Sequence, residues 1–97
     1  MARIIYSAAA LGDLERIVDF LREGSAKSAL EALTQIRSAI AILAAHPRIG
    51  RRAAGRMREL VISYGAGGYV ALYRIDASPA LVRILRIRHQ REAGYRD

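Results

Sequence analysis

The sequence predicts an α+β fold in which a helical hairpin packs on a small antiparallel sheet, in the order β-α-α-β-β-β. Apolar residues recur at helical spacing through residues 8–45, and strand-like alternation begins at residue 57. Short turns separate the three strand-like segments of the second half, which is typical of an antiparallel meander. The 97 residues, 53% of them hydrophobic, are enough for one small domain and exclude a disordered chain.

A short β-branched run opens the chain and is followed by the first helix. Residues 3–7 combine two isoleucines with a tyrosine, a composition typical of a strand. Ser7 can then accept a hydrogen bond from a free amide in the first turn of a helix over residues 8–23. The apolar stripe predicted for this helix consists of Leu11, Leu14, Ile17, Val18 and Leu21.

The second helix is predicted over residues 26–45. Ser25 provides its cap, and Pro47 disfavours helical geometry at His46, so the helix ends there. The two helices, joined by a tight turn, form an αα-hairpin. The stripe of the second helix consists of Leu30, Leu33, Ile36, Ile40 and Leu43.

The second half of the chain is predicted to form the meander. A basic, glycine-punctuated loop over residues 48–56 leads to strands over residues 57–64, 69–76 and 81–89, with turns at 65–68 and 77–80. Simple alternation along the last strand puts Arg86 and Arg88 on the same face as Val82 and Ile84. Arg74 either pairs with an acid on a neighbouring strand or points into a binding face.

Charge is segregated along the chain. Residues 1–47 carry five cations and five acids, whereas residues 48–97 carry eleven arginines and four acids, which accounts for the whole net charge of +7. This asymmetry favours an anionic partner. We expect that partner to bind a set of arginines from the loop and the last strand: Arg48, Arg51, Arg52, Arg56, Arg58, Arg86 and Arg88.

Several classes of protein are disfavoured. The chain has no cysteine, which excludes disulfides and thiolate zinc sites, and its two histidines are far apart, so we expect no metal and no cofactor. The longest strongly apolar run, residues 39–45, is too short to span a bilayer. The N-terminus does not fit a signal peptide, and the expected location is the cytoplasm.

Five segments together resemble the RelE/ParE superfamily of small bacterial toxins. They are residues 6–14 (YSAAALGDL), 46–51 (HPRIGR), 58–60 (REL), 69–74 (YVALYR) and 87–92 (IRHQRE), in the expected order and over nearly the whole chain. The resemblance implies a toxin encoded beside a cognate antitoxin, which neutralises the toxin by wrapping its surface.

The superfamily divides by target, and the resemblance favours one branch. RelE-like toxins cut messenger RNA in the ribosome without a metal, and ParE-like toxins poison DNA gyrase. RelE-like nucleases place lysines on the strand after the helical hairpin, where residues 58–62 contain none. They also place an arginine after the tyrosine of the next strand, where Val70 follows Tyr69. Arg91 matches the arginine after the last strand, and Tyr95 loosely matches a tail aromatic. Two of four features are missing, which favours the gyrase poison.

Three hypotheses remain open from the residues alone. The first is the ParE-like gyrase poison. The second is a RelE-like, ribosome-dependent endoribonuclease in which Arg91 supplies charge and His89 or Tyr95 moves protons. The third is a plain nucleic-acid-binding module. For His89 and Tyr95, a structural role at the edge of the core is the simpler interpretation.

Overall fold

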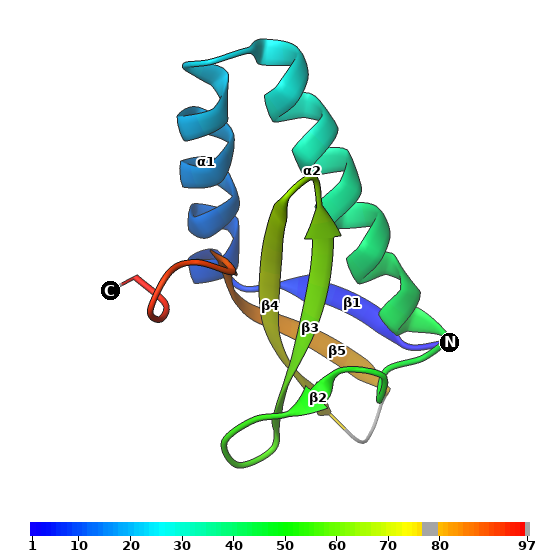
Figure 1. The fold of residues 1–97 in the computed structure, drawn as a ribbon. Helices are drawn as coiled ribbons and strands as arrows, with labels where there is room; N and C mark the ends of the chain where they lie inside the picture. Colours follow the sequence, from blue (N-terminus) through cyan, green and yellow to red (C-terminus); the bar gives the residue numbers. More distant parts are fainter. Residues whose placement is uncertain (77–79, 97) are drawn as a thin grey trace.

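The computed structural model describes residues 1–76 and 80–96 and confirms the α+β fold (Figure 1). A helical hairpin packs on one face of a five-stranded sheet. Residues 77–79 of the predicted last turn lie outside the described part of the chain. The elements are β1 (Arg3–Tyr6), α1 (Ala8–Arg22), α2 (Ala26–Ala41), β2 (Arg51–Arg52), β3 (Met57–Tyr64), β4 (Gly67–Asp76) and β5 (Leu81–His89).

The sheet has the strand order β1-β5-β4-β3-β2. Strands β3, β4 and β5 form the predicted antiparallel meander. The first strand lies at the far edge and pairs with β5 in parallel, so the sheet is mixed and not wholly antiparallel. The segment predicted as a loop contains the two-residue strand β2, which pairs with the start of β3.

Both serine caps form as predicted, but α2 is shorter than expected. The Ser7 hydroxyl accepts from the amide of Ala10 at 3.0 Å, and that of Ser25 accepts from Ser28 at 3.2 Å. The α-helical part of the hairpin ends at Ala41 and tightens into one 3₁₀ turn, Ile42–Ala44, before Pro47. In the described ranges, 1–76 and 80–96, no helix combines the length and hydropathy needed to cross a membrane.

The helices bury most of the predicted stripes: Leu14, Ile36, Ile40 and Leu43 lie in the core, and Ile17 and Leu33 pack against it. Leu11 and Leu30 are 53% and 65% exposed, so their assignment to the buried stripes is wrong. Three alanines, Ala10, Ala29 and Ala32, are buried beside these larger residues and let each helix approach its neighbour closely. The core contains Ala10, Leu14, Ile36, Ile40 and Leu43 from the hairpin segment, and Ile62, Tyr69, Ala71, Tyr73, Val82, Ile84 and Ile87 from the sheet.

A β-bulge in β5 reverses the predicted alternation. Tyr73 pairs with Ile84, but the preceding Leu72 pairs with Arg86, so Leu85 is an extra residue. Ile87 therefore faces the helices together with Ile84. The prediction that Arg86 and Arg88 share a face with Ile84 is wrong: they lie on the opposite, helix-free face of the sheet.

Candidate functional site

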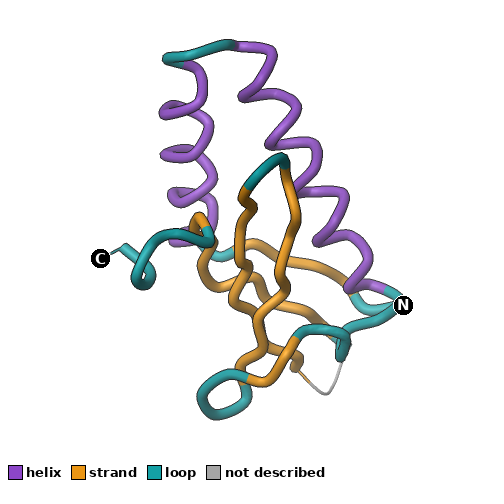
Figure 2. Tube along the Cα trace, in the orientation of Figure 1, coloured by secondary structure: helices purple, strands orange, loops and turns teal. Residues whose placement is uncertain are grey.

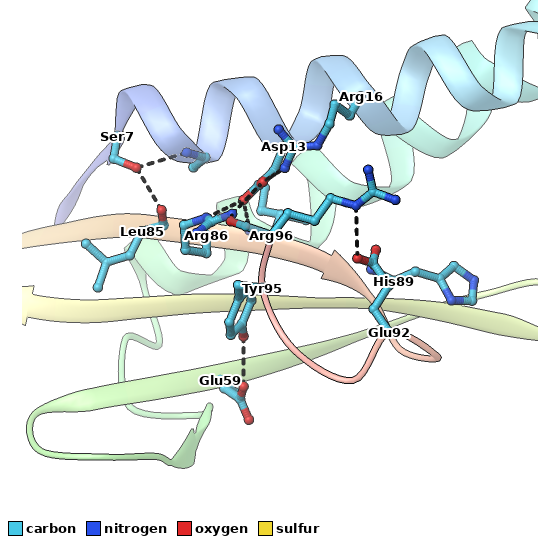
Figure 3. A network of polar contacts seen from close by, with 12 residues as sticks. Ser7, Asp13, Arg16, Glu59, Leu85, Arg86, His89, Glu92, Tyr95 and Arg96 are labelled. Carbon is cyan, nitrogen blue, oxygen red and sulfur yellow. Dashed lines mark hydrogen bonds and ion pairs between the residues drawn. The ribbon is translucent and has the colours of Figure 1, made fainter.

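Helix α1 closes the edge of β5 at the point where β1 ends. The last residue of β1 pairs with Ile84, which leaves the following backbone groups of β5 without a strand partner on that side. The Ser7 hydroxyl donates to the carbonyl of Leu85 at 2.8 Å, and the Asp13 carboxylate accepts from the amide of Ile87 at 2.8 Å (Figure 3). The N-cap of α1, Ser7, and Asp13 within the helix thus satisfy backbone groups of β5 that would be costly to leave without a hydrogen bond.

Asp13 is the centre of this contact and is only 2% exposed. Arg86 donates to both of its oxygens, from Nε at 2.9 Å and Nη2 at 3.1 Å, and Arg16 also pairs with it. Burial alone would raise the pKa of Asp13. The hydrogen bonds from Arg86 and from the amide of Ile87, with the two positive charges, outweigh burial and hold this pKa below its usual value.

On the helix-free face, the C-terminal segment after β5 folds back over the sheet. Tyr95 donates a hydrogen bond to Glu59 of β3 at 2.8 Å, and the guanidinium groups of Arg88 and Arg86 lie 5.3 and 5.8 Å from the centre of its ring. Burial, followed by the hydrogen bond and charge of Glu59, raises the pKa of Tyr95 to about 12. Arg86 also donates to the carbonyl of Arg96, so it links α1 to this segment.

Arg88 organises the same C-terminal segment. Its side chain is 15% exposed, and its Nη1 donates to the carbonyls of His89, Gln90 and Glu92 at 3.2, 3.3 and 3.0 Å. The amide of His89 in turn donates to the Glu92 carboxylate at 3.0 Å. Arg88 therefore holds the turn that returns the chain toward Glu59.

A groove of about 590 Å³ lies on the other side of β5, beside α1. Its apolar lining comes from Ile17, Phe20, Leu21, Tyr69 and Ile87, with charged side chains among the remaining lining residues. We call this the α1 groove. Phe20, which is 73% exposed, extends this apolar lining to the surface of the protein.

His89 and Arg91 line the α1 groove and not the face occupied by Tyr95. The imidazole of His89 meets the ring of Tyr69 edge-on, with 5.3 Å between centroids, and its Nδ1 accepts from the amide of Arg91 at 3.0 Å. The three residues predicted for a nuclease site thus lie on two sides of β5.

The basic loop lies at the end of the molecule away from the turn between the helices (Figure 2). Tyr73 anchors it from the core, because its hydroxyl donates to the carbonyl of Pro47 at 2.7 Å and accepts from the amide of Gly50 at 2.9 Å. Arg58 donates to the carbonyls of Arg48 and Gly50 at 3.1 and 2.8 Å. These contacts give the loop a defined shape.

The arginines at this end differ in their partners. Arg51 pairs with Glu59 at 3.2 Å. Arg74 and Arg83 share Asp76, at 3.4 and 2.8 Å, so Arg74 pairs with an acid of its own strand. Three exposed arginines at this end form no ion pair with any described residue: Arg48, Arg52 and Arg56.

Comparison with known proteins identifies the family. A family model described as ParE toxin of type II toxin-antitoxin system, parDE, matches residues 4–94. Toxin RelE3 of Caulobacter vibrioides is 41% identical over 80 residues, covering 82% of this chain and 85% of that protein. Toxin RelE2 of the same organism is 35% identical over 89 residues, covering 92% and 96%. The chain belongs to the RelE/ParE superfamily of type II toxins.

Two solved structures have a fold similar to that of this RelE/ParE toxin. One is titled chromosomal ParDE TA system from P. aeruginosa, with a TM-score of 0.77 and 24% identity over 92% of this chain and 96% of that chain. The other is the toxin-antitoxin complex RelBE2 from Mycobacterium tuberculosis, with a TM-score of 0.60 and 24% identity over 92% and 98%.

The helix-free face of this toxin contains the positions at which the resemblance would place nuclease cations. Val61, Val70 and Arg88 lie side by side in the register of β3, β4 and β5, and Glu59 lies two residues before Val61. The positions of Val61 and Val70 are therefore apolar, and the position of Glu59 is acidic. In this part of the sheet the positive charge comes from Arg86 and Arg88, which already hold the C-terminal segment.

Sequence reasoning did not single out Asp13, which the structure buries at the contact between α1 and β5. A signal was present, because position 13 is three residues after the buried Ala10 and four before Ile17, on the inward face of the helix. Sequence reasoning also missed that Arg83 lies beside Arg74 and pairs with Asp76, because this proximity follows only from the pairing of β4 with β5.

Proposed function

We propose that this toxin is a ParE-like poison of DNA gyrase, without enzymatic activity, that acts in the cytoplasm and is silenced by a cognate antitoxin. The match to the ParE toxin family over residues 4–94 supports this assignment. So does the helix-free face, where Val61 lies on the strand that carries lysines in RelE-like nucleases and Val70 stands where they place an arginine, as the resemblance implies.

The separation of the candidate nuclease residues is the observation that carries the proposal. Cleavage of RNA through its 2′-OH requires a proton acceptor, a proton donor and positive charge around a single phosphate. His89 and Arg91 line the α1 groove, whereas Tyr95 contacts Glu59 on the other face. With its pKa raised to about 12, Tyr95 stays protonated near neutral pH and is a poor general base. Glu59 would also repel a phosphate bound there.

The antitoxin has a suitable docking surface in the α1 groove. The ParDE and RelBE2 structures with a similar fold are toxin–antitoxin assemblies by their titles. The groove offers an apolar floor and the exposed ring of Phe20, which suit the apolar face of a partner helix. We expect that antitoxin to shield the groove when the two proteins are co-expressed.

The direct test uses purified toxin, gyrase and supercoiled plasmid. A gyrase poison should trap a cleavage complex that becomes linear DNA after denaturation and protease treatment, and added antitoxin should abolish the effect. An Arg91→Ala variant should poison gyrase as well as the wild type does. Absence of both inhibition and cleavage complexes would overturn the proposal.

A second candidate is a RelE-like, ribosome-dependent endoribonuclease, and it is favoured by the names of the two Caulobacter relatives. Its test is cleavage of messenger RNA in a translating extract. Loss of that cleavage in Arg91→Ala or Tyr95→Phe, while gyrase is unaffected by the wild-type toxin, would establish this function instead.

A further inference from the structure

Seven arginines converge on the end of the sheet that is remote from the turn between the helices. The meander brings Arg74 and Arg83 beside the basic loop, because Arg74 pairs with Met57 on one side and Arg83 on the other. We call this surface the basic end. It consists of Arg48, Arg51, Arg52, Arg56, Arg58, Arg74 and Arg83.

The basic end holds most of the net charge of the protein. Its seven arginines meet two acids, Glu59 and Asp76, so it carries +5 of the formal +7. The helical hairpin, residues 8–41, by contrast carries four cations and five acids, a formal charge of −1. Arg56 and Arg74 also line a shallow hollow of about 580 Å³, next to Gly55, which has no side chain to fill it. Asp76 also lines the hollow, but it is paired with Arg74 and Arg83, so this end keeps an excess of positive charge, which attracts a polyanion.

We infer that the basic end binds the phosphodiester backbone of duplex DNA. Guanidinium groups pair with phosphate in a two-pronged geometry, and each phosphate neutralised releases counterions. This inference rests on the proposed function, since gyrase acts on DNA. A poison that binds gyrase beside the bound DNA gains affinity by contacting the phosphodiester backbone of that DNA. The contact is independent of DNA sequence, because it involves no base edge.

Two features distinguish duplex DNA from other polyanions. A single strand would need exposed aromatic rings for its bases to stack on. Tyr73, the tyrosine that reaches this end, is fully buried. An acidic partner helix would need a broad apolar floor. The hollow at the basic end has apolar lining from Met57, Ile75 and Leu85, but these side chains are only partly exposed, and Ile49, at 55%, is the exposed large hydrophobic residue of this end. The α1 groove has such a floor, so the two partners use separate surfaces.

The test measures binding of the full-length toxin to a short fluorescein-labelled duplex by fluorescence anisotropy at increasing salt. The variant Arg48→Glu/Arg52→Glu/Arg56→Glu reverses the three exposed arginines of the basic end that form no ion pair in the described residues. The control Arg22→Glu/Lys27→Glu/Arg37→Glu has the same net charge, with the changes on the hairpin. Each phosphate that is neutralised adds ~0.9 to the magnitude of the slope of log K against log salt. We therefore expect the first variant to reduce the magnitude of this slope by about 2.7, and the control to reduce it far less.

The outcomes separate this inference from the proposed function. If the two variants lost DNA affinity equally, only net charge would matter and the inference would be overturned. Tighter binding of the wild-type toxin to single-stranded DNA than to the duplex would also overturn the inference. Trapping of gyrase by a toxin that does not bind DNA would also overturn it while leaving gyrase poisoning intact. Specific loss of DNA binding in the first variant, with antitoxin binding retained, supports it even if gyrase proves not to be the target.

Discussion

Replacing Asp13 with asparagine should destabilise the toxin by about 3 kcal/mol. Removing one partner of a buried ion pair costs ~3–5 kcal/mol. Asparagine is of similar size and keeps one oxygen for the amide of Ile87, so we expect a loss near the lower bound. Its amide nitrogen, however, would turn a donor toward the guanidinium of Arg86, which now makes two hydrogen bonds to the carboxylate.

The effect is large for a domain of this size. Small domains are stable by ~5–15 kcal/mol, and a loss of 1 kcal/mol lowers Tm by ~4–8 °C for domains of 60–100 residues. A loss of about 3 kcal/mol should therefore lower Tm by ~12–24 °C. The loss of free energy of unfolding is measured by urea unfolding and the change in Tm by thermal unfolding, both followed by circular dichroism because the chain has no tryptophan.

A matched control is available on the same helix. Asp19 is exposed and lies 4.0 Å from Arg22, and surface pairs of this kind contribute ~0–1 kcal/mol. Asp19→Asn should therefore change stability little. If Asp13→Asn were no more destabilising than Asp19→Asn, the buried contact would have no special role and the account of the β5 edge would be wrong.

The pH dependence gives a second readout of the same contact. Since folding lowers the pKa of Asp13, its contribution is fully present above the unfolded value, ~3.9, and is lost as the pH falls through the folded value. Wild-type stability should decline below about pH 4, and that decline should be shallower in Asp13→Asn. Parallel curves for the two proteins would contradict the assignment.

Two further substitutions test the loop anchor and the C-terminal segment. Gly50→Ala should cost ~1–3 kcal/mol in urea unfolding, because the added Cβ would lie 2.4 Å from the Tyr73 hydroxyl, whereas Gly94→Ala, with nothing within 4 Å, should cost much less. Tyr95→Phe should increase hydrogen exchange in residues 90–96 and remove the phenol that titrates at about 12 in an ultraviolet titration. Unchanged exchange would mean that Arg86 and Arg88 alone hold the segment.

Periodicity was sufficient to predict the elements and fold class, but not how the edge of the sheet is completed. The meander followed from alternating apolar residues and short turns, and the hairpin from helical spacing and two serine caps. The parallel pairing of β1 with β5 depends on contacts between residues far apart in the sequence, which local patterns do not encode. The exposed Leu11 and Leu30 show a related limit, because apolar residues on two helical faces leave the buried face undecided.

The bulge at Leu85 explains why the candidate site was harder to predict than the fold. Simple alternation assigns every residue after Leu85 to the wrong face, so it grouped Arg86 and Arg88 with the core and separated them from Glu59. The position of the bulge coincides with the point where β1 ends and Ser7 and Asp13 replace it as partners of β5. The residue that fixes this edge, Asp13, looks like an ordinary surface acid in the sequence.

The side chain of Arg86 connects the two sides of β5. It binds Asp13 at the rim of the α1 groove, donates to the carbonyl of Arg96 and lies over the ring of Tyr95, whose hydroxyl reaches Glu59. Glu92 and Arg96 of the same C-terminal segment line the α1 groove. A partner that fills this groove therefore contacts the segment that covers the helix-free face, so any shift of Arg96 moves the carbonyl that Arg86 holds. If the antitoxin fills the α1 groove, as we propose, these contacts couple its binding to the helix-free face, whichever target the toxin attacks.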